Sequence, residues 1–260
     1  MPGIVLVRVG DILPSMSTAN VRAKVVWKDE VQNTSPGSLS EPFYKILLWD
    51  ETGPIYLFVY LHPKPPMRAN PEFTQQMRRI VDALVVGKLY TFEARVRNFQ
   101  PEYTTQNHSN GAELLFHNMV EDNEVGHGLE DVRGFVPFQF SNAQVVNDTD
   151  VAMAVDVLGT VVRVHNADEG PDELRRFIEL QIMGGQFDCN VWRRHEERFL
   201  VNAVPFRVAI QGAKVTRFDD QVQLNIGNTA TVYMLNTEEE ERILIDPAIL
   251  DGEFYRETFE

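Results

Sequence analysis

The sequence ARVRNF at residues 94–99 returns as AKVTRF at residues 213–218. A second matched pair precedes it in each half of the chain: residues 53–60 read GPIYLFVY, and residues 185–192 read GQFDCNVW. Similar segments that recur in the same order about 120–130 residues apart indicate a duplicated domain and not a short-period solenoid.

Short segments rich in β-branched and aromatic residues surround both copies, which is typical of strands. We expect strands at 21–28, 44–49, 55–60 and 89–99, and again at 155–165, 177–183, 187–192, 206–218 and 222–233. We expect helices at 71–84, which starts on proline and repeats apolar residues at helical spacing, and at 194–200. This is the order of OB barrels, so the sequence predicts an all-β protein with two tandem five-stranded OB-fold barrels, each with a short helix between strands 3 and 4.

The negative charge of the chain is concentrated outside the predicted barrels. The net charge is −14, yet residues 1–120 hold 12 Lys and Arg against 11 Asp and Glu, and residues 155–235 hold 9 against 11. Residues 121–154 hold 1 against 7, and residues 236–260 hold 2 against 9. We therefore expect domain 1 at 1–120, an acidic connector at 121–150, domain 2 at 151–235 and an acidic tail at 236–260. Each barrel can still carry a local basic face.

Several function classes have no support in the sequence. Cys189 is the single cysteine, so neither an internal disulfide nor a Cys-rich zinc site can form, and a reducing compartment fits best. No apolar run approaches the ~18 residues of a membrane helix. The histidines lack metal-ligand spacing, and no HExxH, GxSxG or GxxxxGK[ST] motif occurs. We therefore expect no enzyme activity, no metal, no cofactor and no membrane association.

Side-chain alternation separates an outward row from a core row in each strand. In the third strand of the second domain, Asn190 and Trp192 share the polar row, and Arg193 follows directly. Lys214 and Phe218 share the outward row of the fourth strand. An aromatic residue therefore stands among polar and basic residues on two strands.

The first domain repeats this arrangement. Its outward basic and aromatic residues on the first and fourth strands are Arg22, Lys24, Lys28, Arg95, Arg97 and Phe99. Tyr56, Phe58 and Tyr60 share one row of the third strand, and we expect at least one of them to be in the core or under the helix. Trp27 and Phe92 share the parity of core residues, so we expect both to be buried.

Exposed aromatic side chains between cations suit single-stranded nucleic acid, because every base can stack and every phosphate attracts Lys or Arg. Other placements fit the same pattern. Trp192 could cap the apolar end of its barrel, and Phe99 and Phe218 could pack under a loop or against the neighbouring domain. The basic residues could form only a solvated strand face.

Residues 208–218 (VAIQGAKVTRF), with NVW at 190–192 before them, resemble the second DNA-binding OB domain of the replication protein A large subunit. VPFQFS at 136–141 resembles the linker between its first two DNA-binding domains, and DVLG at 156–159 the start of the second. AKV at 23–25, Tyr44 and DETG at 50–53 resemble the first domain. The resemblance covers about residues 8–235 and is most specific over 136–218.

The resemblance implies a nuclear protein that binds single-stranded DNA with little sequence preference, in replication, repair, recombination or telomere maintenance. It implies stacking by Trp192, Phe218 and Tyr44, and backbone contacts by Lys214, Lys24 and Lys28. Together with strand parity, it gives as candidate stacking residues Trp192, Phe218, Phe99, Tyr60 and Tyr44. The candidate backbone contacts are Lys24, Lys28, Arg22, Arg95, Arg97, Lys214, Arg193 and Arg163.

The sequence also departs from this family. A single cysteine does not allow the zinc-ribbon OB domain of the large subunit in this sequence, and we expect its N-terminal protein-interaction OB domain to be absent too. The resemblance then implies a fragment or a shortened relative, such as a meiosis- or telomere-specific one. The alternative function is an OB-fold scaffold subunit with little DNA binding of its own, joined to a protein partner through the acidic tail or as part of a hetero-oligomer. RNA in place of DNA is a third option.

Overall fold

The structure is a computed structural model of the chain. It describes residues 5–29, 43–61, 71–98, 111–121, 134, 136–165, 175–200, 202–227, 230–235, 237, 244–246 and 249. These residues form two compact units, the first reaching Val136 and the second starting at Pro137. None of the helices described is long and apolar enough to cross a membrane.

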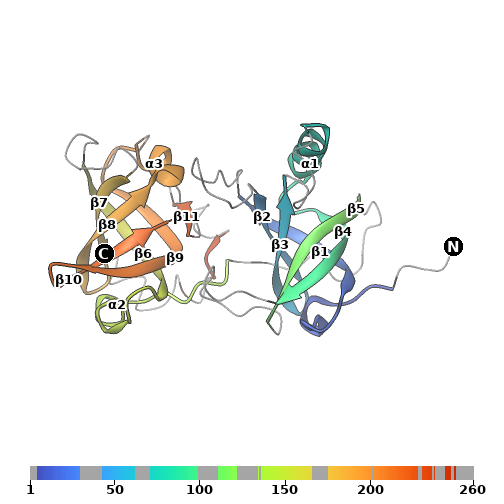
Figure 1. Ribbon diagram of the computed structural model, residues 1–260, viewed down its shortest axis with the longest axis horizontal. Helices are drawn as coiled ribbons and strands as arrows, with labels where there is room; N and C mark the ends of the chain where they lie inside the picture. The colour runs from blue at the N-terminus through green and yellow to red at the C-terminus, as the bar shows by residue number, and fades with distance from the viewer. Residues whose placement is uncertain are drawn as a thin grey trace. The chain divides into compact units, whose positions relative to one another are not determined.

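The first unit is a closed five-stranded barrel (Figure 1). Its strands are β1 (Thr18–Lys28), β2 (Phe43–Asp50), β3 (Gly53–Tyr60), β4 (Leu89–Asn98) and β5 (Ala112–Glu121). They close in the order β1-β2-β3-β5-β4, with β3 and β5 parallel and the other pairs antiparallel. A 3-10 turn, η1 (Val9–Asp11), precedes β1, and helix α1 (Pro71–Ala83) lies between β3 and β4.

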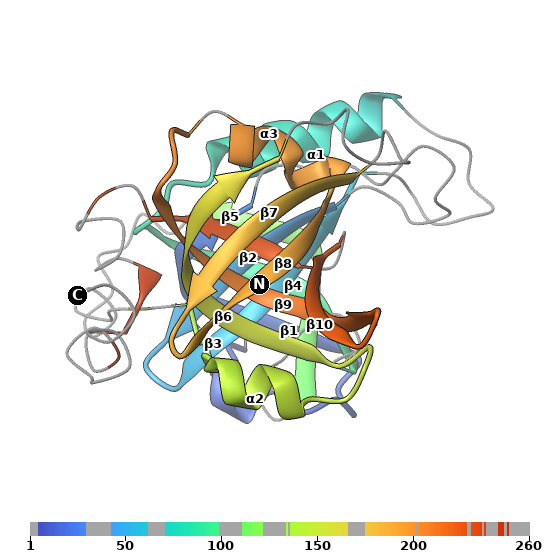
Figure 2. The ribbon, with the colours of Figure 1, turned by 90° about the vertical axis from the view of Figure 1, so that its left-hand side faces the viewer.

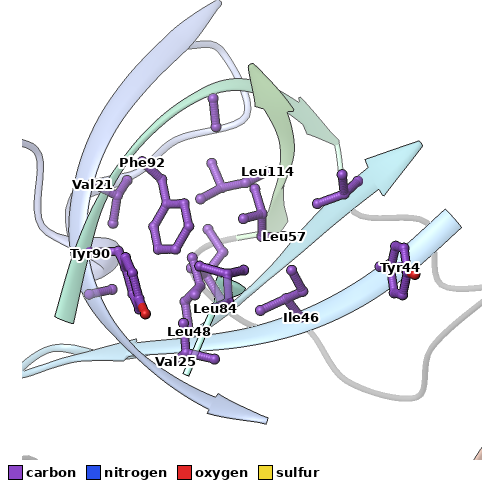
Figure 3. Packing of buried hydrophobic residues seen from close by; sticks show 14 of the residues in the cluster. Val21, Val25, Tyr44, Ile46, Leu48, Leu57, Leu84, Tyr90, Phe92 and Leu114 are labelled. Carbon is purple, nitrogen blue, oxygen red and sulfur yellow. The ribbon is translucent and has the colours of Figure 1, made fainter. Parts of the chain in front are cut away.

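Alternating residues of each strand fill the barrel interior. Figure 3 shows Phe92, Leu57 and Leu114 pointing toward one another, and all three are fully buried. Burying each such side chain contributes about 1.5–3 kcal/mol. The expected burial of Phe92 is thus confirmed. Trp27, expected in the core, is only partly buried, because a register shift between Val25 and Trp27 inverts the alternation.

The second unit repeats the topology of the first, and its strands are labelled in Figure 2. Its strands are β6 (Ala154–Val164), β7 (Arg175–Ile182), β8 (Gly185–Trp192), β9 (Phe206–Phe218) and β10 (Gln221–Ile226). β10 pairs in parallel with β8 and antiparallel with β9, which closes the barrel in the order β6-β7-β8-β10-β9. Helix α3 (Arg193–Leu200) stands between β8 and β9. The prediction of two five-stranded OB-type barrels with a helix between strands 3 and 4 is confirmed.

Three details of the second unit differ from the sequence-based expectation. The expected strand at 222–233 is divided into β10 and β11 (Thr231–Met234), because β10 and β11 pair with successive halves of the long strand β9. Helix α2 (Ala143–Asp148) was not expected; it begins where the Asn142 side chain accepts a hydrogen bond from the Val145 backbone. The described stretch before it packs on this barrel, because buried Asp156 accepts the Gln139 N–H at 3.1 Å.

Candidate nucleic-acid interface

A continuous row of side chains crosses the outward face of the second barrel. Cα partners connect Phe177 on β7 to Asn190 on β8, Asn190 to Asn225 on β10, and Asn225 to Lys214 on β9. All four side chains are partly exposed, whereas the intervening inward residues are buried. We call these four residues the second-barrel row. An aromatic ring, two amides and a cation thus lie in this order across four strands, on a surface that solvent can reach.

Trp192 lies beside this row at the end of β8. Its indole Nε1 donates a hydrogen bond of 2.5 Å to Asn225 Oδ1. An indole N–H can only donate, so this bond also orients the Asn225 amide. Asn190 Nδ2 donates to Gln223 Oε1 at 3.2 Å, which joins β8 to β10 in the same way. The partly exposed ring is therefore held in place on the polar face, where sequence parity predicted it.

Phe218 lies at the tip of the β9–β10 hairpin and is 66% exposed. The turn residues Asp219 and Asp220 both have positive φ, 49° and 62°, as in the two-residue turns that match strand twist. Such an exposure does not fit the alternative in which Phe218 packs under a loop. An apolar ring in water is available to stack, although the two turn carboxylates beside it oppose phosphate binding.

An acidic position limits the row on β7. Glu179 stands two residues beyond Phe177, and its Cα partner on β8 is the exposed residue Asp188. Its carboxylate accepts hydrogen bonds from Gln186 at 3.0 Å and Arg163 at 3.4 Å, and its Oε1 lies 3.1 Å from His165 Nε2. Arg163, predicted to contact phosphates, has a side chain that is 63% exposed, and it forms an ion pair with this carboxylate.

The matching row of the first barrel has different chemistry. Its Cα partners connect Lys45 on β2, Phe58 on β3, Leu115 on β5 and Arg95 on β4. Lys45 and Phe58 are 4% and 5% exposed, and Lys45 Nζ lies 4.0 Å from the centroid of the Tyr56 ring. We call these four residues the first-barrel row. Its centre is apolar, with buried Phe58 next to partly exposed Leu115, and exposed Arg95 stands at its edge.

Arg97 and Tyr60, two predicted contacts of the first barrel, bind each other. Arg97 Nη1 donates to the Tyr60 hydroxyl at 3.0 Å, and its Nε donates to Glu113 at 2.8 Å. Its guanidinium also lies 4.6 Å from the Phe58 ring centroid. The Glu113 side chain is only 3% exposed, so Arg97 compensates a buried carboxylate. This network uses much of the binding capacity of both residues.

Two predicted contacts, Tyr44 and Lys28, are buried or hydrogen-bonded within the first barrel. Tyr44 is 7% exposed and belongs to the core cluster, at whose edge it lies in Figure 3, because its position on β2 points inward; a stacking function does not fit. Lys28 Nζ donates to the carbonyls of Val81 and Leu84, each at 2.9 Å, and so compensates the C-terminal end of α1. These hydrogen bonds give Lys28 a structural function, and its phosphate contact stays a prediction.

The remaining predicted residues are distributed as follows. Arg22 and Lys24 are partly exposed on β1. Phe99 and the Arg193 side chain lie outside the described residues. Sequence reasoning missed Phe177 and Asn225. Phe177 shares outward parity with Glu179, which was a usable signal, whereas Asn225 becomes significant only through the parallel pairing of β8 and β10.

Two observations concern metal ligands and the cysteine thiol. Within the described ranges, no group of His, Cys, Asp or Glu could hold a metal ion. Cys189 is fully buried, and burial raises the pKa of its thiol, so the thiol stays protonated at neutral pH and is a poor nucleophile.

Comparison with known proteins adds the fold relationship. No family model and no curated protein sequence matches the chain. Its structure is similar to that of a replication protein A heterotrimer bound to ssDNA, with 19% identity, a TM-score of 0.55, and coverage of 92% of this chain and 54% of that chain. It is also similar to p202 HIN1 in complex with 12-mer dsDNA (9% identity, TM-score 0.51, coverage 90% and 96%) and to the p204 HINb domain (9%, 0.50, 84% and 97%). These likenesses establish a tandem OB fold, and the chain spans about half the length of the replication protein A chain.

Proposed function

We propose that this protein binds single-stranded DNA with low sequence preference, chiefly through the second-barrel row with Trp192 and Phe218. The observation that carries the proposal is a partly exposed polar row flanked by a fixed indole and an exposed phenyl ring. Bases would stack on the two rings, and Lys214 would attract phosphates. The protein would act in the nucleus, in replication, repair, recombination or telomere maintenance, without catalysis.

A binding comparison between strand types tests this proposal. Fluorescence anisotropy on the full chain would use a labelled oligo-dT of about 30 nucleotides, a duplex of equal length and an RNA strand of equal length, over a salt series. We expect preference for the single DNA strand and a log–log salt slope near −0.7 per phosphate contact. Single-strand binding weaker than about 100 μM at low salt would contradict the proposal, since even non-specific binding usually exceeds that affinity.

A protein-interaction scaffold is the second candidate, and the first-barrel row favours it. Two of its four residues are almost fully buried, and Arg97 and Lys45 are engaged within the barrel. The net charge of −14 points the same way. This candidate predicts negligible binding of any nucleic acid, together with capture of a protein partner that is lost when residues 236–260 are removed.

A further inference from the structure

We propose that Phe177 is a third base-stacking position of the second barrel, so that the bound strand crosses β8 and continues over β7. This inference rests on the function proposed above and extends it. Phe177 belongs to none of the sequence repeats and occupies the end of the second-barrel row opposite Lys214. It would bring the aromatic positions on this face to three.

The placement of Phe177 on β7 is outward. The next residue, Ile178, and Leu180 beyond it are fully buried, while Glu179 between them is only partly buried. Phe177 itself is partly exposed. The partly buried apolar residues described as packing on the second core are Val164, Val222 and Met234, so Phe177 is not an extension of that core. A partly exposed ring with no part in the described core needs another explanation.

The neighbours of Phe177 continue the surface that holds Trp192. Phe177 faces Asn190 across the β7–β8 pair, and Trp192 stands two residues beyond Asn190 on the same side. Diagonal neighbours in an antiparallel pair lie about 7–8 Å apart, within reach of aromatic side chains. The two residues are therefore diagonal neighbours on one face, from which their rings could stack on consecutive bases. The Asn190 amide between them is held by Gln223 and presents hydrogen-bonding groups to a bound base.

The charges near Phe177 allow a strand to pass. Two acidic residues lie nearby: Glu179 on β7, to whose carboxylate Arg163 and Gln186 donate hydrogen bonds, and exposed Asp188 on β8, a diagonal neighbour of Phe177. On the other side, the His165 backbone N–H donates to the Phe177 carbonyl at 2.9 Å, which extends the row to the end of β6. A strand following the row thus starts at the Lys214 cation and reaches Phe177 beside a compensated carboxylate.

The first barrel has no equivalent of this position. If Tyr60 and Trp192 are matched at the ends of β3 and β8, the residue that corresponds to Phe177 is Lys45. Lys45 is 4% exposed and lies over the Tyr56 ring. The third stacking position therefore belongs to the second barrel alone.

Substitutions that separate stacking from packing test the inference. In the full chain, Phe177→Leu keeps an apolar side chain and should weaken binding of the 30-nucleotide oligo-dT by about 5- to 150-fold, the range for one lost base stack. Phe177→Tyr keeps the aromatic ring and should bind within about three-fold of wild type. Gln181→Ala, an exposed change on the same side of the same strand beyond Glu179, is the matched control and should have no effect.

Direct contact provides the second measurement. Ultraviolet cross-linking to oligo-dT that carries 5-iododeoxyuridine, followed by peptide mass spectrometry, should place an adduct on Phe177 in wild-type protein. If wild type binds and Trp192→Ala weakens binding, but Phe177→Leu binds as wild type and no adduct forms on β7, this inference alone is wrong. If wild type fails to bind any single strand, the proposed function itself is wrong. Should Phe177→Leu unfold, the adduct position decides.

Discussion

The two barrels have the same strand order, but the residues on their outward faces differ in exposure and chemistry. The first-barrel row has buried Lys45 and Phe58, with Leu115 beside them, where the second-barrel row has partly exposed Phe177, Asn190 and Asn225. Equal topology therefore does not give equal surfaces. Function depends on the site that the fold carries and not on the fold itself.

The difference also concerns charge. In the first barrel, Arg97 compensates buried Glu113 and binds Tyr60, so its interactions stabilise the barrel. In the second barrel, Lys214 is partly exposed at the edge of an amide row. We therefore expect DNA-binding energy to be concentrated in the second barrel, and the following variants test that asymmetry.

The largest expected effect is on affinity, from Trp192→Ala. Loss of one stacked base should weaken oligo-dT binding by about 1–3 kcal/mol. The positional equivalent in the first barrel, Tyr60→Ala, should cost less than about 1 kcal/mol, because Arg97 holds the Tyr60 hydroxyl. Anisotropy titrations of both variants measure the two losses of affinity, which can then be compared. Equal losses would mean that the two faces bind alike, and the comparison would fail.

Arg97→Ala should act mainly on stability. It leaves the Glu113 carboxylate buried without its cation, which should lower the free energy of unfolding of the first barrel by about 1–2 kcal/mol. A Trp192→Phe background allows the fluorescence of Trp27 and Trp49 to report this barrel alone during urea unfolding. Lys214→Ala, which lies in the other barrel, should leave this unfolding transition within about 0.5 kcal/mol of its parent and reduce the salt slope of DNA binding by about 0.7. The reverse pattern would assign the phosphate contact to Arg97.

Lys28→Ala should destabilise the first barrel by about 0.5–1.5 kcal/mol, because carbonyls at the end of α1 lose their donor. DNA affinity should stay within about two-fold of wild type, which is roughly the precision of such titrations. Lys88→Ala removes an exposed lysine close to the same helix end and serves as the control for charge. A drop in affinity without a drop in stability would restore the phosphate contact predicted from sequence.

The smallest effect is expected at the β9–β10 turn. Replacing Asp219 and Asp220 by Asn removes two carboxylates beside Phe218 and keeps a residue type that tolerates positive φ. Affinity should rise roughly two-fold at low salt, because exposed charges contribute only a few tenths of a kcal/mol. The gain should disappear near 1 M salt, because the Debye length there is only about 3 Å and the two carboxylates are screened. A gain that persists at high salt would point to a change in turn conformation.

Much of the fold followed from local patterns. The repeated segments, the period-two alternation and the helix with Pro71 at its start indicated both barrels, and the alternation placed Phe92 inside and Trp192 outside. The alternation misled where pairing is irregular, because the register shift after Val25 turned Trp27 outward. The functions predicted for Tyr44 and Lys28 came chiefly from family resemblance, which carries no information about the partners that these side chains find here.

The sequence by itself determined the two barrels and the inward or outward direction of most strand residues, because alternation is a property of each strand. Barrel closure determined what those outward residues contact. It pairs β8 with β10 and so brings Asn225 to the Trp192 indole, 33 residues earlier in the chain. It also brings Lys28 to the end of α1, more than 50 residues later. Such contacts depend on non-local pairing, which no short-range pattern encodes.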